Sequence, residues 1–335
     1  MTDTSRDDEK VGAPAEPRDA TQTDGTAADG RTDGTAADGT TTDGGAVEAN
    51  PGHVGRPQDP ENPGPDDETT VGDDADRTDD STIVAVVVAV GLGLLGPLIA
   101  LVGGFGIFAV DVVVGGLPLA VNLLLTLLVG QYVAFAGLAL AYLAWRGFDR
   151  SGIVSYLGVR KPSLIELGLV VAGWVVILVS VMGISLLVQL LGVETAANQS
   201  AELAIGNPAI IPLFIAASFL VIGPCEEILY RGVVQGRLRE SLPAAPSIII
   251  ASAVFAFIHV LALTGGIEGR LTTVAILFFP SLVFGAVYEY TENIVVPSLL
   301  HGLHNAVIFT LLYVSITYAD EFEELAEMMA LVAVF

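Results

Sequence analysis

Two adjacent carboxylates, Glu226 and Glu227, lie within an apolar stretch of the sequence, and Arg231 follows four residues after the second. A charged side chain at the centre of a bilayer costs about 3 kcal/mol, so it normally faces a partner or a water-filled cavity. Residues four apart share a helix face, which allows Glu227 to pair with Arg231. Glu226 lies roughly 140° from Arg231 around the helix. The spacing predicts that Glu226 stays free for chemistry, whereas the alternative is an ion-pair cluster that only fixes helix packing.

Two further polar motifs occur in apolar stretches nearer the carboxyl end. Phe255 and His259 are four residues apart, and so are His301 and Asn305, so each pair shares a helix face. A carboxylate with a nearby imidazole can activate water as a general base. A second imidazole and a carboxamide can donate hydrogen bonds to a developing oxyanion. Together with the carboxylates, these groups have the chemistry needed to hydrolyse a carbonyl compound.

The same nitrogen and oxygen groups could instead hold one divalent metal ion such as zinc. Glu226, His259 and His301 are the candidate ligands, but no His-Glu-x-x-His pair is present. Because Asn305 shares the face of His301, we expect His301 to stabilise an oxyanion. Any metal would then be held by Glu226 and His259 together with water.

The elements that must position these residues are apolar helices. The chain has 335 residues, is 52% hydrophobic and has a mean hydropathy of +0.65, which indicates an all-α, polytopic transmembrane helical bundle. Glycines at 103, 104 and 106 are expected to loosen the chain, so residues 107–114 could form a further span or a re-entrant piece. We therefore expect about seven spans, with a range of six to eight, at residues 83–102, 119–145, 167–191, 209–229, 247–263, 271–287 and 294–313.

The amino-terminal part of the chain differs sharply in composition. Residues 1–80 hold 22 of the 38 acidic and 6 of the 14 basic residues, with almost no large apolar residue. Such a segment cannot bury enough surface to offset its ordering entropy, so we expect a disordered acidic tail in which His53 has no function. The net charge of −24 argues against nucleic acid as a partner and suggests a halophilic source, since salt screens a dense negative surface.

Basic residues cluster in two connections between spans. The first holds Arg146, Arg150, Arg160 and Lys161, and the second holds Arg231, Arg237 and Arg239. Basic connections close to span ends usually face the cytoplasm, so we expect both to lie on that side. With seven spans, this orientation places the amino-terminal tail in the cytoplasm. The expected parts are a tail (1–80), amino-terminal helices with their basic connection (81–162), a core (163–317) and an acidic carboxyl-terminal segment (318–335).

The three motifs, in this order on successive apolar spans, resemble those of the CPBP intramembrane proteases, the family of type II CAAX prenyl endopeptidases and abortive-infection proteins. The motifs are Glu226-Glu227-x-x-x-Arg231, Phe255-x-x-x-His259 and His301-x-x-x-Asn305, and the resemblance covers roughly residues 163–315. It implies that Glu226 and His259 activate water, that His301 and Asn305 stabilise the oxyanion, and that Glu227 and Arg231 support the site. It assigns no role to His304.

The resemblance implies a multi-pass membrane endopeptidase, described for the family as metal-dependent, that cuts a membrane-embedded or lipid-anchored protein or peptide. One alternative is a catalytically inactive scaffold or immunity protein of the same fold. Another is a proton-coupled transporter, for which paired repeats with broken helices would be expected. No such repeat is evident in the membrane region of the sequence.

Overall fold

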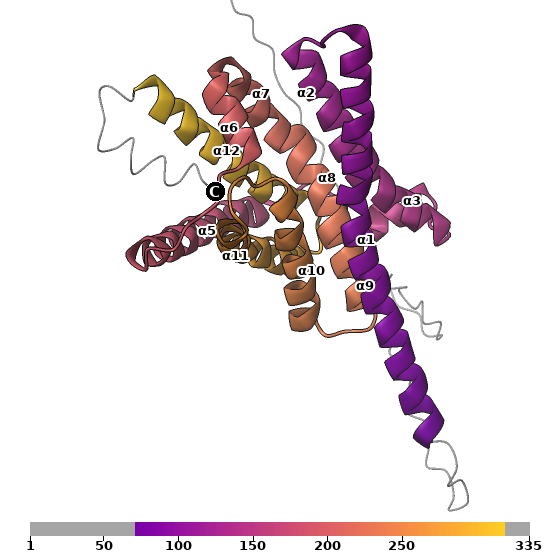
Figure 1. The fold of residues 1–335 in the computed structure, drawn as a ribbon. Helices are drawn as coiled ribbons and strands as arrows, with labels where there is room; N and C mark the ends of the chain where they lie inside the picture. Colours follow the sequence, from indigo (N-terminus) through magenta and orange to yellow (C-terminus); the bar gives the residue numbers. More distant parts are fainter. Residues whose placement is uncertain (1–70, 319–335) are drawn as a thin grey trace, which may run out of the picture. The chain divides into compact units, whose positions relative to one another are not determined.

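The computed structural model describes residues 71–318, with side chains from Ser81 onward (Figure 1). The helices before the central span are α1 (Val71–Val114), α2 (Leu119–Leu127), η1 (Leu128–Gly137), α3 (Leu138–Trp145), α4 (Arg150–Tyr156), α5 (Leu164–Leu190) and α6 (Gln199–Gly206). The helices of the fourth span are η2 (Pro208–Ile210), α7 (Ile211–Ala217), η3 (Ser218–Ile222), α8 (Gly223–Glu227), η4 (Ile228–Gln235) and α9 (Gly236–Arg239). The last helices are α10 (Ala244–Ile258), η5 (His259–Leu261), α11 (Ile267–Thr291) and α12 (Val295–Thr317).

The all-α, multi-spanning fold predicted from the sequence is confirmed. Within residues 71–318, 7 helical stretches are long and apolar enough to cross a membrane. They are Ser81–Val114, Leu119–Trp145, Leu164–Leu190, Pro208–Arg239, Ala244–Leu261, Ile267–Thr291 and Val295–Thr317. Each predicted span overlaps one of these stretches, and the fourth continues ten residues beyond its predicted end, to Arg239. The chain is therefore a multi-pass membrane protein.

The first helix is longer than the sequence analysis predicts. Helix α1 runs without interruption from Val71 to Val114, so residues 107–114 belong to it and form no separate span. The glycines at 103, 104 and 106 do not break it, since glycine occurs readily within membrane helices. The expected tail boundary at residue 80 also falls inside α1, because extending a helix that has already nucleated costs little per residue. The rest of the predicted tail, and the acidic segment from residue 319 onward, lie outside the described residues.

Two groups of connections between spans are joined by contacts. The basic connection after α3 meets the one after α9, where Glu240 pairs with both Arg146 and Arg237. The turn before α12 joins the same group through a hydrogen bond from the Ile294 amide to the Leu157 carbonyl, at 3.2 Å. The two predicted basic connections therefore lie together, but Arg231 does not belong to the second one: the fourth span runs from Pro208 to Arg239, and Arg231 is buried within it. A second group joins the segment before α6 to the segment after η5 through an isolated bridge between residues 198 and 263.

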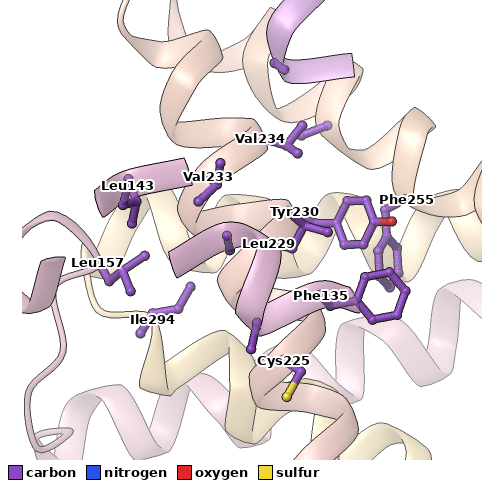
Figure 2. Close-up of a cluster of buried hydrophobic side chains, with 14 of the residues drawn as sticks. Phe135, Leu143, Leu157, Cys225, Leu229, Tyr230, Val233, Val234, Phe255 and Ile294 are labelled. Atoms are coloured by element: carbon purple, nitrogen blue, oxygen red, sulfur yellow. The ribbon is translucent and has the colours of Figure 1, made fainter. Parts of the chain in front are cut away.

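One cluster of buried side chains fixes the second span against the fourth and fifth (Figure 2). Tyr230 is its centre: its ring lies 6.0 Å from that of Phe135 on η1 and 5.0 Å from that of Phe255 on α10. The Tyr230 hydroxyl donates to the Gly93 carbonyl of α1 at 2.9 Å. Four helices thus converge directly beside Glu226, whose neighbour Cys225 belongs to the same cluster.

Candidate active site

Both central carboxylates lie on α8, a five-residue segment of the fourth span. Glu226 is 7% exposed and Glu227 is 0% exposed. Helix α8 is flanked by two π-helical segments, η3 and η4. Such segments are rare and occur frequently at functional sites, because the additional residue per turn re-aims neighbouring side chains.

Glu227 pairs with Arg231 as the helical spacing predicts. Arg231 Nε donates to Glu227 Oε2 at 3.1 Å, and neither side chain is exposed. The other guanidinium nitrogens donate to the hydroxyls of Ser252 on α10, at 3.3 Å, and Ser281 on α11, at 2.8 Å. The guanidinium carbon also lies 5.1 Å from the ring centre of Phe255. Arg231 is thus a fully buried charge whose partners come from three spans, which is how such a charge is tolerated.

Glu227 also holds His301, a contact that the sequence analysis did not predict. His301 Nδ1 lies 2.9 Å from Glu227 Oε1, and an ionised carboxylate only accepts, so Nδ1 carries the proton. The other ring nitrogen, Nε2, lies 3.8 Å from Glu226 Oε2. The His301 ring is further fixed by stacking on Phe284, with ring centres 4.8 Å apart. Glu227 therefore sets both the orientation and the tautomer of the imidazole that faces Glu226.

Two glycines allow the helices of this contact to approach closely. A Cβ on Gly223 of α8 would lie 2.7 Å from the Ser298 carbonyl of α12. A Cβ on Gly302 of α12 would lie 2.8 Å from the Phe219 ring and 2.9 Å from the Ser218 carbonyl. Small residues at helix contacts are the usual means of close packing within a membrane. Gly302 follows His301 directly, so the close approach positions that ring against Glu227.

Glu226 has one occupied and one free oxygen. Its Oε1 accepts a hydrogen bond from Gln131 Nε2 at 2.9 Å. Its Oε2 is buried and has no hydrogen-bond partner among the described residues. A buried polar atom without a partner is rare in native structures, and it is often explained by a catalytic role or by bound water. The prediction that Glu226 is free of Arg231 therefore holds, but Gln131 was missed.

His259 lies beside this group without joining it by a hydrogen bond. Its Nδ1 lies 2.7 Å from the Phe255 carbonyl oxygen, which can only accept, so Nδ1 carries the proton and Nε2 is left as an acceptor. Phe255 packs edge-on against both imidazoles, at 4.8 Å from His259 and 5.7 Å from His301. Within residues 71–318, no hydrogen bond joins His259 to Glu226.

Two further polar residues of α12 follow His301. Asn305, which is partly buried, follows His301 by one helical turn. His304 packs edge-on against Phe284 at 6.4 Å, so its observed contact is with an aromatic ring. The expected oxyanion role of Asn305 stays a prediction.

Glu226, His259 and His301 are the side chains that could hold a metal ion. Within the described part of the chain, no group of three or more His, Cys, Asp or Glu side chains is arranged to hold a metal ion. The Nδ1 atoms of His259 and His301 each face an acceptor, the Phe255 carbonyl and the Glu227 carboxylate, and the Nε2 atom of His301 faces Glu226 at 3.8 Å. Histidines that ligate a metal through one ring nitrogen usually donate the other in this way. A metal held by Glu226 and His259 with water, or by these residues together with His301, stays a prediction.

The comparison with protein families gives a match over the part of the chain that contains the candidate active site. Residues 208–307 match the family model described as type II CAAX prenyl endopeptidase Rce1-like. The matched segment contains Glu226, Glu227, His259, His301 and Asn305. No curated protein and no solved structure matches the chain. Over residues 208–307 this chain is similar to the type II CAAX prenyl endopeptidases of the Rce1-like family, which confirms the resemblance predicted from its motifs.

Proposed function

We propose that this protein is an intramembrane endopeptidase that hydrolyses a peptide bond in a membrane-embedded or lipid-anchored protein. The family match supports a protease at the level of the fold and reaction class. The observation that carries the proposal is the free Oε2 of Glu226, which is buried and faces an imidazole already oriented by a second carboxylate. This is the arrangement of a general base with an adjacent hydrogen-bonding group.

In the proposed reaction, a water oxygen attacks the carbonyl carbon of the scissile peptide bond. Glu226 Oε2 takes one proton of that water, and His259 Nε2, the free acceptor of its ring, helps to orient it. The carbonyl π electrons move to oxygen and form a tetrahedral oxyanion. The proton held by Glu226 then passes to the leaving nitrogen as the carbon–nitrogen bond breaks, which yields a carboxylic acid and an amine.

His301 and Asn305 are proposed to stabilise the oxyanion. Asn305 donates from its amide nitrogen. Because Nδ1–H of His301 is committed to Glu227, Nε2 can donate only while the ring carries both protons. Removing one such donor typically lowers kcat by about 10²–10³.

The test of this proposal is cleavage of a membrane-anchored peptide library by the purified protein in liposomes. Each peptide is presented with and without an isoprenoid thioether near its carboxyl end, so that a CAAX-like preference is measured directly. We expect fragments that are absent when Glu226→Ala replaces the wild type. If wild type and Glu226→Ala yield the same fragments, or neither yields any, the protease proposal is wrong and an inactive scaffold of this fold is favoured.

We further propose that the two basic connections, and with them the amino-terminal tail, face the cytoplasm. The contact of Glu240 with Arg146 and Arg237 brings both connections to the same end of the spans, and basic connections favour the cytoplasmic side. Single cysteines placed at Arg150 and at Gly265 would report the two ends of the spans. An impermeant thiol reagent added to intact cells should label the second and not the first, and the reverse labelling would overturn the orientation.

A further inference from the structure

Gln131 is a polar side chain on the second span that contacts the proposed base directly. Its Nε2 donates to Glu226 Oε1 at 2.9 Å across 95 residues of sequence. It lies on η1, well before the segment 208–307 that matches the family model. The first two spans were expected to lie outside the catalytic core, so this contact extends the site to a part of the chain with no assigned role.

The direction of this hydrogen bond follows from the chemistry of the two groups. An ionised carboxylate only accepts, so the amide of Gln131 must present its nitrogen and not its oxygen to Glu226. The Gln131 Oε1 is then buried without a partner, and so is Glu226 Oε2. Two neighbouring acceptors thus lack donors within the described residues, and a water molecule or a peptide N–H is the kind of donor that each requires.

The surroundings hold Gln131 in place. The next residue, Tyr132, donates its hydroxyl hydrogen to the Leu220 carbonyl of η3 at 3.2 Å. One turn later, Phe135 packs against Tyr230 of η4 in the cluster of Figure 2. The second span is therefore attached to the fourth span on both sides of Glu226. The π-helical segments of residues 71–318 occur only on these two spans, at η1, η3 and η4.

We infer that Gln131 is a positioning residue for the general base: it binds Oε1 of Glu226 and thereby leaves Oε2 as the oxygen that takes the proton from water. This inference rests on the proposed function, because it assigns Glu226 the role of base. A carboxylate held at one oxygen keeps the other at a fixed distance from His301 Nε2, and active-site groups need such supporting contacts to stay in productive geometry.

The kinetic test is Gln131→Met, which keeps the side-chain length and removes the donor. The substrate is the library peptide that the wild type cleaves fastest, and rates are normalised to folded protein. We expect kcat to fall about 10–100-fold, as for lost supporting contacts elsewhere, with KM within about twofold. Asn122→Leu, a polar-to-apolar change on the same span, is the matched control and should leave both constants unchanged. An unchanged kcat, or a loss confined to KM, would overturn the inference.

A second measurement does not depend on cleavage. Melting temperatures in detergent are measured for Gln131→Met, Glu226→Met and the double variant. We expect the double variant to lose less than the sum of the single losses, because both remove the same contact. Additive losses of melting temperature would show that Gln131 and Glu226 do not interact, whatever the result of the peptide assay. If the wild type cleaves nothing, the proposed function fails while this cycle still tests the contact.

If Gln131→Met does not fold, Gln131→Glu replaces it in the kinetic test. This variant keeps the size and polarity of the side chain but places a second carboxylate against Glu226. We expect a lower kcat with KM again nearly constant. Wild-type kcat in Gln131→Glu would show that Gln131 does not act on the base.

Discussion

Glu227 Oε1 lies 2.9 Å from Nδ1 of His301, so the carboxylate next to the proposed base holds the imidazole of another span. Its second oxygen accepts from Arg231 at 3.1 Å. One buried carboxylate therefore links a fully buried cation to the ring that faces Glu226. These contacts give the two adjacent glutamates different roles. The roles can be tested by substituting one glutamate at a time.

Glu227→Ala should be unstable, whereas Glu226→Ala should fold nearly as well as the wild type. Removing Glu227 leaves Arg231 as an unpaired buried charge, a change that typically costs about 3–5 kcal/mol. Removing Glu226 breaks one hydrogen bond, from the neutral amide of Gln131, and leaves no buried charge unpaired. Melting in detergent compares the two variants. Equal losses of stability would contradict the separate roles.

His301→Ala should slow the chemical step by about 10²–10³ without changing the metal content of the protein. The reason is that Nδ1 of His301 is bound to Glu227, so the ring is held for hydrogen bonding by its other nitrogen. Single-turnover rates measure the chemical step, and mass spectrometry of wild type and variant measures bound metal. Loss of metal together with activity in the variant would show that His301 is a ligand.

Gly302→Ala should lower both stability and activity. A Cβ there would lie 2.8 Å from the Phe219 ring and 2.9 Å from the Ser218 carbonyl, so the two helices must separate or distort. Overpacking of this kind costs about 1–3 kcal/mol and would also move His301 away from Glu227. Gly183→Ala on α5 is the matched control, since nothing lies within 4 Å of its Cβ position. A Gly302→Ala variant that melts and cleaves like the control would contradict the close packing.

Deleting residues 1–70 should leave cleavage within a few-fold of the full-length rate. The segment has few large apolar residues and, apart from His53, no candidate catalytic group. The deletion ends where α1 begins, at Val71. The assay is the same peptide cleavage in liposomes, and folding is checked by melting. A truncated protein that melts like the wild type but has lost activity would show that the tail takes part in the reaction.

Features that depend on short-range periodicity could be predicted from the sequence. Apolar runs of the right length gave the seven spans. A separation of four residues correctly placed Arg231 beside Glu227, and His259 beside Phe255. In each case the relevant partner lies within one helical turn or one span, so local geometry alone determines the contact.

Contacts between distant spans could not be predicted, because they depend on how the helices pack. The pairing of Glu227 with His301 joins residues 74 positions apart, and it requires the glycines at 223 and 302. For Gln131 the sequence holds one signal of a contact: it is a polar side chain within an apolar span, and such side chains commonly hydrogen-bond to other helices. That signal identifies a residue that needs a partner, but it does not say that the partner is Glu226.

The most direct test of the account is the kcat of Glu226→Gln on the best peptide of the library. This substitution keeps the size of the side chain and an oxygen that can accept from Gln131, but it removes the base. We predict a loss of about 10²–10⁴ in kcat, the usual contribution of a general base, with a melting temperature close to that of the wild type. A Glu226→Gln protein that cleaves within tenfold of the wild-type rate would contradict the central role of Glu226.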